Sequence, residues 1–442
     1  MSSSRRRCHP QRRKPCRLGA VTSWVLRIAR QSLKTHARDF GLVFDLQGWG
    51  SSVRAINIDD LRCQAKKRLP KAVFEFVDGA AHDERTLAAN RRDFERVWFA
   101  PKVLVDVGER RQSVQVLGQR YASPFVMGPT GLAGMLWPEG DIATARATAK
   151  AGVGYCLSTN SNCSIEQVAR HGRADFWFQL YVQRDRELTR ALLQRAQAAG
   201  CPVLCVTVDL PIQGPRERDE RNGFTVPLRL DWQNTFDFAR RLGWLWRMAT
   251  GPRITFANLA RGDGAPSKLT TVAQHIATQF DPTVTWKEID WLRSLWNGPM
   301  AIKGILRADD ALLAAEHGAD AVVVSNHGGR QLDGASSALA ALPAIVDAVG
   351  DRVEVLIDGG IRRGSDIVKA LALGARACLV GRASLYGLAA AGEAGVARAI
   401  EILMKEIDIT LALLGQPDIA KLDRTAITPG VEAPFWGAPS RR

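Results

Sequence analysis

Eight short apolar runs recur along this chain, and segments with helical periodicity separate most of them. The runs are Phe125–Met127, Val153–Leu157, Phe176–Tyr181, Val203–Val208, Met300–Ile302, Ala321–Val324, Val353–Ile357 and Ala377–Val380. The helical segments include Arg186–Ala199, Asp309–Glu316 and Ser337–Val349. Continuous apolar runs of this length indicate strands buried on both faces, as in a parallel sheet with helical crossovers. The pattern predicts an α/β fold, a TIM (β/α)8 barrel.

A polar residue or a glycine-rich turn stands at the C-terminal end of each predicted strand. In chain order these are Pro129-Thr130-Gly131, Ser158, Gln179 with Tyr181, Thr207 with Asp209, Lys303, His327 with Arg330, Asp358-Gly359-Gly360, and Gly381-Arg382. In a (β/α)8 barrel the carboxyl ends of all strands meet at one face, where active sites are built. An open doubly wound sheet is the alternative fold, but it is not expected to place polar groups at every strand end.

The chain is predicted to comprise a basic extension at 1–54, a barrel domain at 55–415 and a C-terminal tail at 416–442. Residues 58–95 form a helical segment before the barrel, in which Asp59-Asp60 could cap one helix and Pro70 could begin the next. A further strand is expected near Val114–Leu117.

One connection is much longer than a barrel loop requires. About 90 residues separate Asp209 from Met300, against the usual two to six. Trp286–Trp296 is assigned to the barrel helix before strand five, and about 223–285 to an insertion after strand four. Within it, Phe236–Met248 interleaves tryptophan with arginine. Such a segment suits either a membrane interface or a lid whose tryptophans pack on the barrel.

The net charge of +15 is concentrated near the N-terminus, where residues 1–38 hold 11 Lys or Arg and no Asp or Glu. A disordered, solvated tail is the favoured interpretation, with a membrane anchor and a transit peptide as alternatives. No nucleic-acid partner is expected, because neither aromatic interleaving nor a binding fold accompanies the charge. No apolar run is long enough to span a membrane. A cytoplasmic location, with or without peripheral contact to the inner membrane, is predicted.

The eight cysteines show no metal-ligand or redox spacing. Cys156, Cys205 and Cys378 fall within predicted strands, where they would act as small hydrophobic residues in a reducing compartment. No metal site and no disulfide framework are expected.

The stretch Ser325–Asp333 (SNHGGRQLD) is the most informative for chemistry, because a histidine and an arginine emerge together where a core strand ends. His327 can take a proton near neutral pH, and Arg330 can hold a carboxylate with two parallel hydrogen bonds. Asp209 also leaves a core strand, and pairing with His327 would orient the imidazole, although a helix cap is the alternative. A base beside a carboxylate clamp indicates chemistry on a carbon next to a carboxylate.

Glycine-rich turns with arginine follow the last two predicted strands, at Asp358–Gly364 and at Gly381-Arg382. Backbone N–H groups freed by glycine at a helix start can hold a phosphate, and this fold often binds phosphate at these two loops. A phosphorylated cofactor is therefore expected. Lys303, after strand five, could pair with an anionic ring or a phosphate.

Together these residues resemble the FMN-dependent L-2-hydroxy acid dehydrogenase and oxidase family, which includes glycolate oxidase and the flavin domain of flavocytochrome lactate dehydrogenase. The similarity runs from about Ile58 to Gly415. The motifs that carry it are Ser325–Asp333, Pro129-Thr130-Gly131, Thr207-Val208-Asp209 and Asp358–Gly364. The chain also resembles membrane-associated (S)-mandelate dehydrogenase, a member of this family, through Gly128–Leu132, Trp137-Pro138 and Gly364–Leu371.

The resemblance implies oxidation of an L-2-hydroxy acid, mandelate- or lactate-like, to the 2-oxo acid by bound FMN. It implies that His327 is the base, with Asp209 beside it. Arg330 and Arg216 would hold the substrate carboxylate, and Tyr181 would hydrogen-bond the substrate oxygen. The residues implied to bind FMN are Pro129, Thr130, Gly131, Ser158, Gln179, Thr207, Lys303, Ser325, Asp358, Gly360, Arg362, Gly381 and Arg382. Lys303 would stabilise the reduced, anionic flavin, and the last four would bind its phosphate. A homo-oligomer, a tetramer by analogy, is expected.

Two positions bear on specificity. Phe76 stands where the family usually has a tyrosine that bonds the substrate carboxylate, so a hydrogen bond worth about 1–3 kcal/mol is expected to be missing; we hypothesise that a larger, more apolar acid is preferred. Gly131 is often alanine in the oxidases. With the Trp/Arg insertion, it favours a dehydrogenase that passes electrons to a quinone or another acceptor, and an H2O2-producing oxidase is the alternative.

Overall fold

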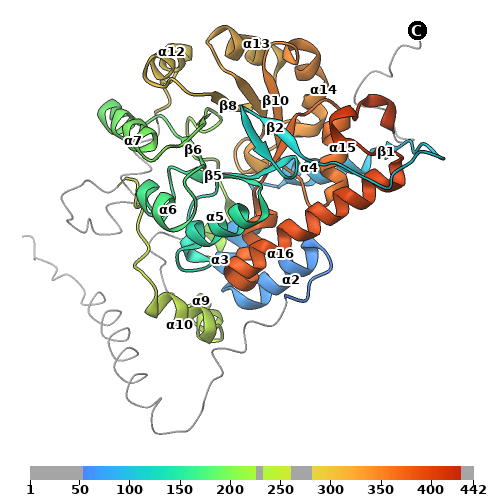
Figure 1. Ribbon diagram of the computed structural model, residues 1–442. Helices are drawn as coiled ribbons and strands as arrows, with labels where there is room; N and C mark the ends of the chain where they lie inside the picture. Colours follow the sequence, from blue (N-terminus) through green and yellow to red (C-terminus); the bar gives the residue numbers. More distant parts are fainter. Residues whose placement is uncertain (1–52, 225–231, 260–280, 430–442) are drawn as a thin grey trace, which may run out of the picture. The chain divides into compact units, whose positions relative to one another are not determined.

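The computed structural model describes residues 53–224, 232–259 and 281–429 (Figure 1). The predicted basic extension lies outside these ranges, except for its last two residues. At the centre lies a closed barrel of parallel strands in the order β10-β11-β4-β5-β6-β7-β8-β9. Their bounds are β4 (Phe125–Met127), β5 (Gly154–Ser158), β6 (Trp177–Leu180), β7 (Leu204–Thr207), β8 (Met300–Ile305), β9 (Ala321–Val324), β10 (Glu354–Asp358) and β11 (Ala377–Val380). Each predicted strand is confirmed to within a few residues.

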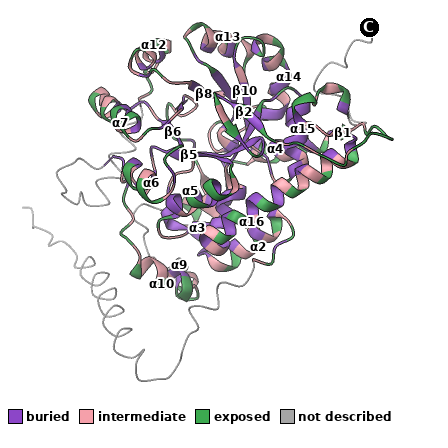
Figure 2. Ribbon diagram, viewed as in Figure 1, coloured by how far each residue is buried: buried purple, intermediate pink, exposed green. Residues whose placement is uncertain are grey.

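Helices surround the barrel, as the periodic segments predict (Figure 1). They are α5 (Gly140–Ala151), α6 (Ile165–His171), α7 (Arg186–Ala198), α12 (Trp286–Leu295), α13 (Ala308–Glu316), α14 (Ala338–Val349), α15 (Gly364–Ala372) and α16 (Arg382–Leu414). Their inward faces and the strands form the buried part of the molecule, coloured purple in Figure 2. The (β/α)8 prediction is therefore confirmed.

Three helices precede the barrel: α2 (Ile58–Arg68), α3 (Lys71–Asp78) and α4 (Arg85–Glu95). Pro70 stands at the start of α3, as predicted. The cap of α2 differs from the prediction: Asn57 accepts the backbone N–H of Asp60, and the Asp60 carboxylate accepts the backbone N–H of Asn57. Asp60 therefore completes a reciprocal capping box, because asparagine at the preceding position supplies the acceptor.

A hairpin of β2 (Val114–Val116) and β3 (Gln119–Tyr121) confirms the strand expected near Val114–Leu117. Its residues pack with inward-facing side chains of the barrel, including Trp177, Cys156 and Cys205. The fully buried Trp177 donates its Nε1–H to the Tyr121 hydroxyl at 2.8 Å. The hairpin thus contributes apolar surface and a hydrogen-bond acceptor to the barrel interior.

The folded domain extends beyond the predicted boundary at 415. Strand β12 (Ile427–Pro429) pairs with β1 (Val97–Phe99) in antiparallel register, with Trp98 opposite Thr428. Residues 416–429 therefore belong to the folded domain, and a tail could begin only after them. The short length of β12 explains why no strand signal stood out in the sequence.

The connection after β7 begins with α8 (Glu217–Arg221), and the predicted insertion contains α9 (Trp232–Ala239) and α10 (Leu242–Thr250). Trp244 is buried and donates its Nε1–H to the Met135 carbonyl at 2.8 Å, whereas Phe236, Leu242 and Trp246 remain 69%, 72% and 41% exposed. The Trp/Arg segment therefore docks on the barrel through Trp244, as the lid prediction requires. It also exposes apolar side chains, and its contact with a membrane stays a prediction. None of the described helices has both the length and the apolar character needed to cross a bilayer.

The Trp177–Tyr121 bond gives a stability prediction. Tyr121→Phe should lower the free energy of unfolding by about 1–3 kcal/mol, because it leaves the buried indole N–H without its acceptor. Chemical denaturation measures this change. Trp98→Phe, at an exposed position of β1, is the control and should change it by less than about 0.5 kcal/mol. Equal stability of Tyr121→Phe and the wild type would contradict the assigned role.

Candidate active site

A cavity of about 650 Å³ opens where the strands end, and most of the predicted site residues line it. Those that line it are Pro129, Thr130, Gly131, Tyr181, Arg216, Lys303, His327, Arg330, Asp358, Gly360, Arg362, Gly381 and Arg382. The other predicted residues lie outside this lining. Ser158, Asp209 and Ser325 bond the lining residues Asn160, His327 and Lys303; Gln179 bonds Ser158, and Thr207 is paired with Lys303 in the sheet. Closure of the barrel brings together groups that are far apart in sequence because all strands end at one face.

His327 sits in a short turn after β9 with a left-handed backbone, at φ 56°. Its Nδ1 lies 2.8 Å from Asp209 Oδ1, so Nε2 is the ring atom available to a ligand. Burial disfavours the charge on Asp209, but His327 and Lys303 hold the pKa of this carboxyl below its usual value. The predicted histidine–aspartate pair is present, and the lowered pKa keeps Asp209 ionised beside the imidazole.

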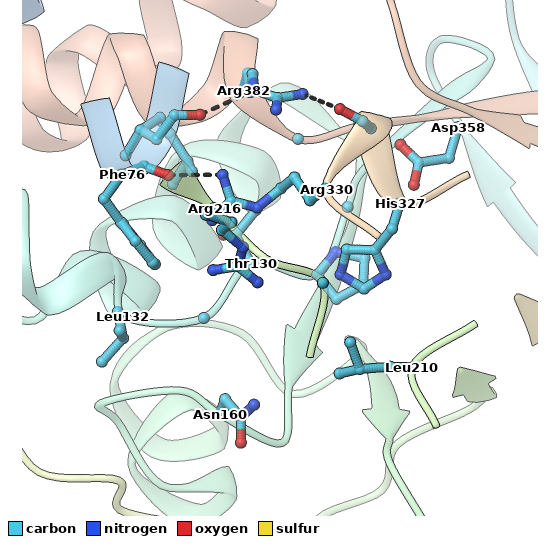
Figure 3. Close-up of a pocket in the computed structure, with 18 of the residues that line it drawn as sticks. Phe76, Thr130, Leu132, Asn160, Leu210, Arg216, His327, Arg330, Asp358 and Arg382 are labelled. Atoms are coloured by element: carbon cyan, nitrogen blue, oxygen red, sulfur yellow. Dashed lines mark hydrogen bonds between the residues drawn. The ribbon is translucent and has the colours of Figure 1, made fainter. Parts of the chain in front are cut away.

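Arg330 and Arg216 come together over the ring of Phe76. Their guanidinium carbons lie 5.0 and 5.9 Å from its centroid, and Figure 3 shows both arginines between Phe76 and His327. Gly214 permits this approach, since a Cβ there would fall 2.5 Å from the Arg330 carbonyl oxygen. Gln331 fixes the contact by donating to the carbonyls of Asp209 and Ile212.

The C-terminal end of α3 holds two of the arginines in place. Arg330 donates to the carbonyls of Phe76 (2.6 Å) and Gly79 (3.0 Å). Arg382 donates to the carbonyls of Val77, Gly79 and Gly328. Carbonyls at the end of a helix lack intrahelical donors and carry partial negative charge, so they suit guanidinium groups. The helical segment before the barrel therefore completes the site.

Positive charge at the cavity is only partly compensated. Burial lowers the pKa of Arg330 well below its usual value, and the charges of Arg216 and Arg382 lower it further. Burial also lowers the pKa of Arg216, which Asp219 partly offsets from 3.9 Å. A bound carboxylate or phosphate would relieve this mutual repulsion. The cavity is therefore suited to an anionic ligand.

Lys303 lies deep in the site and is 4% exposed. Its Nζ lies 2.9 Å from Asp358 Oδ2 and donates to Ser325 Oγ at 3.0 Å. Burial would lower the pKa of Lys303, but Asp358 and Asp209 together hold it above the usual value. Ser325 Oγ also donates to Asp358 and accepts the backbone N–H of His327. Ser325 thus joins the lysine to the histidine turn.

The predicted phosphate loop differs in one respect. The backbone N–H groups of Arg362 and Arg363 donate to Asp366 Oδ2 at 2.8 and 2.9 Å, and that of Gly364 donates to Glu406 Oε2 at 2.7 Å. These amides already have carboxylate partners, so they are not the phosphate donors. Gly360, Gly381 and the arginine side chains remain as candidates, and a Cβ at Gly381 would meet only Thr130 Cγ2, at 3.8 Å.

Several cavity residues have no counterpart in the sequence prediction. They are Leu132, Asn160, Leu210, Asp219, Phe224 and Phe256. Asn160 lies two residues past Ser158, so extending the strand-end rule by one turn would have found it. Phe224 and Phe256 belong to the insertion, where neither periodicity nor motif marks them. Phe224 stacks on Phe76 with centroids 4.5 Å apart and an interplanar angle of 11°.

Comparison with known proteins agrees with this site. A family model described as FMN-dependent dehydrogenase matches residues 65–429. An L-lactate dehydrogenase of Caulobacter vibrioides is 44% identical, covering 83% of this chain and 96% of its own. An L-lactate oxidase of Nostoc sp. is 45% identical, covering 83% and 96%. A crystal structure of the monotopic membrane protein (S)-mandelate dehydrogenase is 43% identical, with a TM-score of 0.82, covering 85% of this chain and all of that one.

The uncompensated guanidinium groups predict stabilisation by a small dicarboxylate. Saturating oxalate should raise the free energy of unfolding by about 2–3 kcal/mol, the value expected near a hundredfold excess over Kd, and thermal denaturation with and without oxalate measures the shift. Arg330→Gln should lose most of it. Arg424→Gln, which removes an exposed ion pair with Asp347, should keep it. An equal shift in Arg330→Gln would contradict the assignment.

Proposed function

This chain belongs to the FMN-dependent dehydrogenase family and is an oxidoreductase acting on 2-hydroxy acids, and we propose that His327 accepts the substrate proton while Arg216 and Arg330 hold its carboxylate. The observation that carries the proposal is the convergence of all three side chains on one cavity, with Asp209 bonded to the far nitrogen of the imidazole. A base and a carboxylate clamp that line one cavity suit proton removal from a substrate whose carboxylate the clamp holds.

The described residues fit FMN. Gln179 Nε2 and Thr207 Oγ1 are buried polar atoms without a hydrogen-bond partner, as expected of groups that face a polar heterocycle. Gln179, Thr207, Ser158, Lys303 and the backbone at Pro129-Thr130-Gly131 would hold the ring. Arg362, Arg382, Gly360 and Gly381 would hold the phosphate. Bound FMN supplies the two-electron acceptor for the substrate carbon.

The chain's own residues manage the proton and the orientation. Oxidation of a 2-hydroxy acid to the 2-oxo acid releases two electrons and two protons, and His327 Nε2 would receive one of those protons. Asp209 would stabilise the resulting imidazolium, because its pKa stays low despite burial. Tyr181 would bond the substrate oxygen from the β6 side, and the arginines would fix the carboxylate so that the α-carbon faces the ring.

The apolar side chains that line the cavity favour a substrate acid with a bulky, apolar side chain. Phe76, Phe224, Leu132, Leu210 and Phe256 all line the cavity. Phe76 lacks the hydroxyl that would bond a carboxylate, and its ring instead supports both arginines through cation–π contacts. We therefore propose an aromatic or branched L-2-hydroxy acid as the preferred substrate, since such a side chain would cover this apolar surface.

We further propose that a membrane quinone or a similar acceptor reoxidises the enzyme. The support is the set of exposed apolar side chains on α9 and α10, Phe236, Leu242 and Trp246, with Arg240 over the Phe236 ring. Exposed apolar side chains with a neighbouring arginine suit an anionic membrane surface, and a structural relative is a monotopic membrane protein. We also propose that the enzyme is a homo-oligomer and that any membrane contact is on the cytoplasmic side.

An anaerobic flavin-reduction screen tests the substrate proposal. Across short, branched and aromatic L-2-hydroxy acids, the aromatic and branched acids should give the largest reduction rate over Kd. Phe76→Tyr should raise the reduction rate over Kd for lactate by about tenfold relative to that for mandelate. The reason is that an added hydrogen bond to the carboxylate is worth about 1–3 kcal/mol and matters most where contacts to the substrate side chain are few. If Phe76→Tyr left the ratio unchanged for every acid, the proposed role of Phe76 would be wrong.

Peroxide release tests the acceptor proposal. In aerobic turnover without another acceptor, the enzyme should produce H2O2 slowly, and an added soluble quinone should raise kcat by at least about tenfold. An oxygen electrode and a peroxide assay measure both rates. Rapid H2O2 release, stoichiometric with substrate and unaffected by quinone, would identify an oxidase and overturn this part of the proposal.

A further inference from the structure

Two buried asparagines join the helix before the barrel to the loop that carries His327. Asn90 lies in α4 and is 2% exposed; Asn326 follows β9 and is 5% exposed. Their side-chain amides exchange two hydrogen bonds, from Asn90 Nδ2 to Asn326 Oδ1 at 2.9 Å and from Asn326 Nδ2 to Asn90 Oδ1 at 2.8 Å. A reciprocal pair of this kind fixes the orientation of both amides, because flipping either one would set like atoms against each other.

The Asn326 side-chain amide makes two further hydrogen bonds, and these shape the turn that carries His327. Its Oδ1 also accepts the backbone N–H of Gly329 at 3.1 Å, and its Nδ2 donates to the Ser336 carbonyl at 2.9 Å. Between these contacts His327, Gly328 and Gly329 have successive φ values of 56°, 67° and 77°. Left-handed backbone at a non-glycine residue persists only where its surroundings impose it. The Asn326 amide therefore helps to impose the conformation that aims the imidazole.

Asn90 also contacts the second functional loop. A Cβ at Gly360 would fall 2.1 Å from the Asn90 carbonyl oxygen, and a Cβ at Gly359 would lie 3.6 Å from the Asn90 side-chain amide. The next residue, Arg91, donates to the Gly360 carbonyl and to Asp366 Oδ2. One turn of α4 thus touches both the turn that carries His327 and the loop proposed to hold the FMN phosphate.

We propose that Asn90 is a positioning residue for the reaction: through Asn326 it sets the place of His327 relative to the bound cofactor. The inference rests on His327 being the base, as proposed above. It predicts a specific division of effects, because Arg330 is held separately by the carbonyls of Phe76 and Gly79. Loss of the Asn90 contact should therefore slow the proton-transfer step and leave binding of the substrate carboxylate nearly unchanged.

Asn90→Asp is the sharpest variant because it preserves shape and volume. A carboxylate at 90 has no N–H to donate, so one of its oxygens faces the Asn326 amide oxygen whichever way that amide is turned. The repulsion should displace the Asn326 amide and weaken its bond with the Gly329 N–H. Anaerobic stopped-flow reduction of the FMN-loaded enzyme by mandelate gives the limiting reduction rate per bound flavin and the substrate Kd. We expect the rate to fall about 10- to 100-fold, with Kd within about threefold of wild type.

Thr86→Val is the matched control. Thr86 lies one turn earlier in α4, is 1% exposed and donates to the Ala335 carbonyl, so Thr86→Val removes a side-chain bond of the same helix that does not involve Asn326. It should lower the denaturation midpoint while keeping the reduction rate within about twofold of wild type. A merely structural role for Asn90 predicts the same behaviour in Asn90→Asp, and that result would overturn the inference.

His327→Gln, measured alongside, separates the two proposals. A slow His327→Gln enzyme with an Asn90→Asp enzyme of wild-type rate would overturn this inference alone. A wild-type rate in His327→Gln would show that His327 is not the base, and the positioning role of Asn90 would fail with that proposal. If Asn90→Asp fails to fold, Asn90→Ser, which has a smaller side chain, supplies the same rate and Kd; its wild-type rate would likewise overturn the inference.

Discussion

The C-terminal end of α3 is the contact on which the rest of the site depends. Its carbonyls accept hydrogen bonds from Arg330, which comes from the loop after β9, and from Arg382, which follows β11. Without these acceptors the N–H groups of two buried guanidinium groups would lack partners at the barrel mouth. With them, the positive charge is held in a fixed place and is only partly offset by Asp219, since the carbonyls satisfy hydrogen-bond donors and do not neutralise charge. The site is therefore organised for an anionic substrate and an anionic cofactor.

The same helix segment links affinity to specificity. Phe76 contributes its carbonyl to Arg330 and its ring to both Arg216 and Arg330, while Phe224 stacks on that ring. Under the proposed function, a tyrosine in this place would add one hydrogen bond to the substrate carboxylate. Phenylalanine supports the arginines and leaves apolar surface at the cavity, so this one position would affect both how the carboxylate is held and which substrate side chain is favoured.

The barrel could be predicted because buried parallel strands appear in the sequence as continuous apolar runs, and the site because polar groups such as Gln179, Lys303 and His327 stand at or just after the ends of those runs. Most of what could not be predicted depends on contacts across the fold. The exception is local: Asp366, at the start of α15, bonds the amides of Arg362 and Arg363, a cap that the glycine-rich motif did not signal. Phe224 and Phe256 reach the cavity from an insertion without a recognisable motif, and the Asn90–Asn326 pair joins residues 236 positions apart.

A crystal structure of the FMN-loaded enzyme with a bound 2-oxo acid tests the central claim most directly. The account predicts the ligand carboxylate within hydrogen-bond distance of Arg216 and Arg330, its α-carbon over the flavin ring, and His327 Nε2 facing the substrate oxygen or α-carbon. A ligand carboxylate bound away from both arginines, or an imidazole turned away from the flavin, would contradict it.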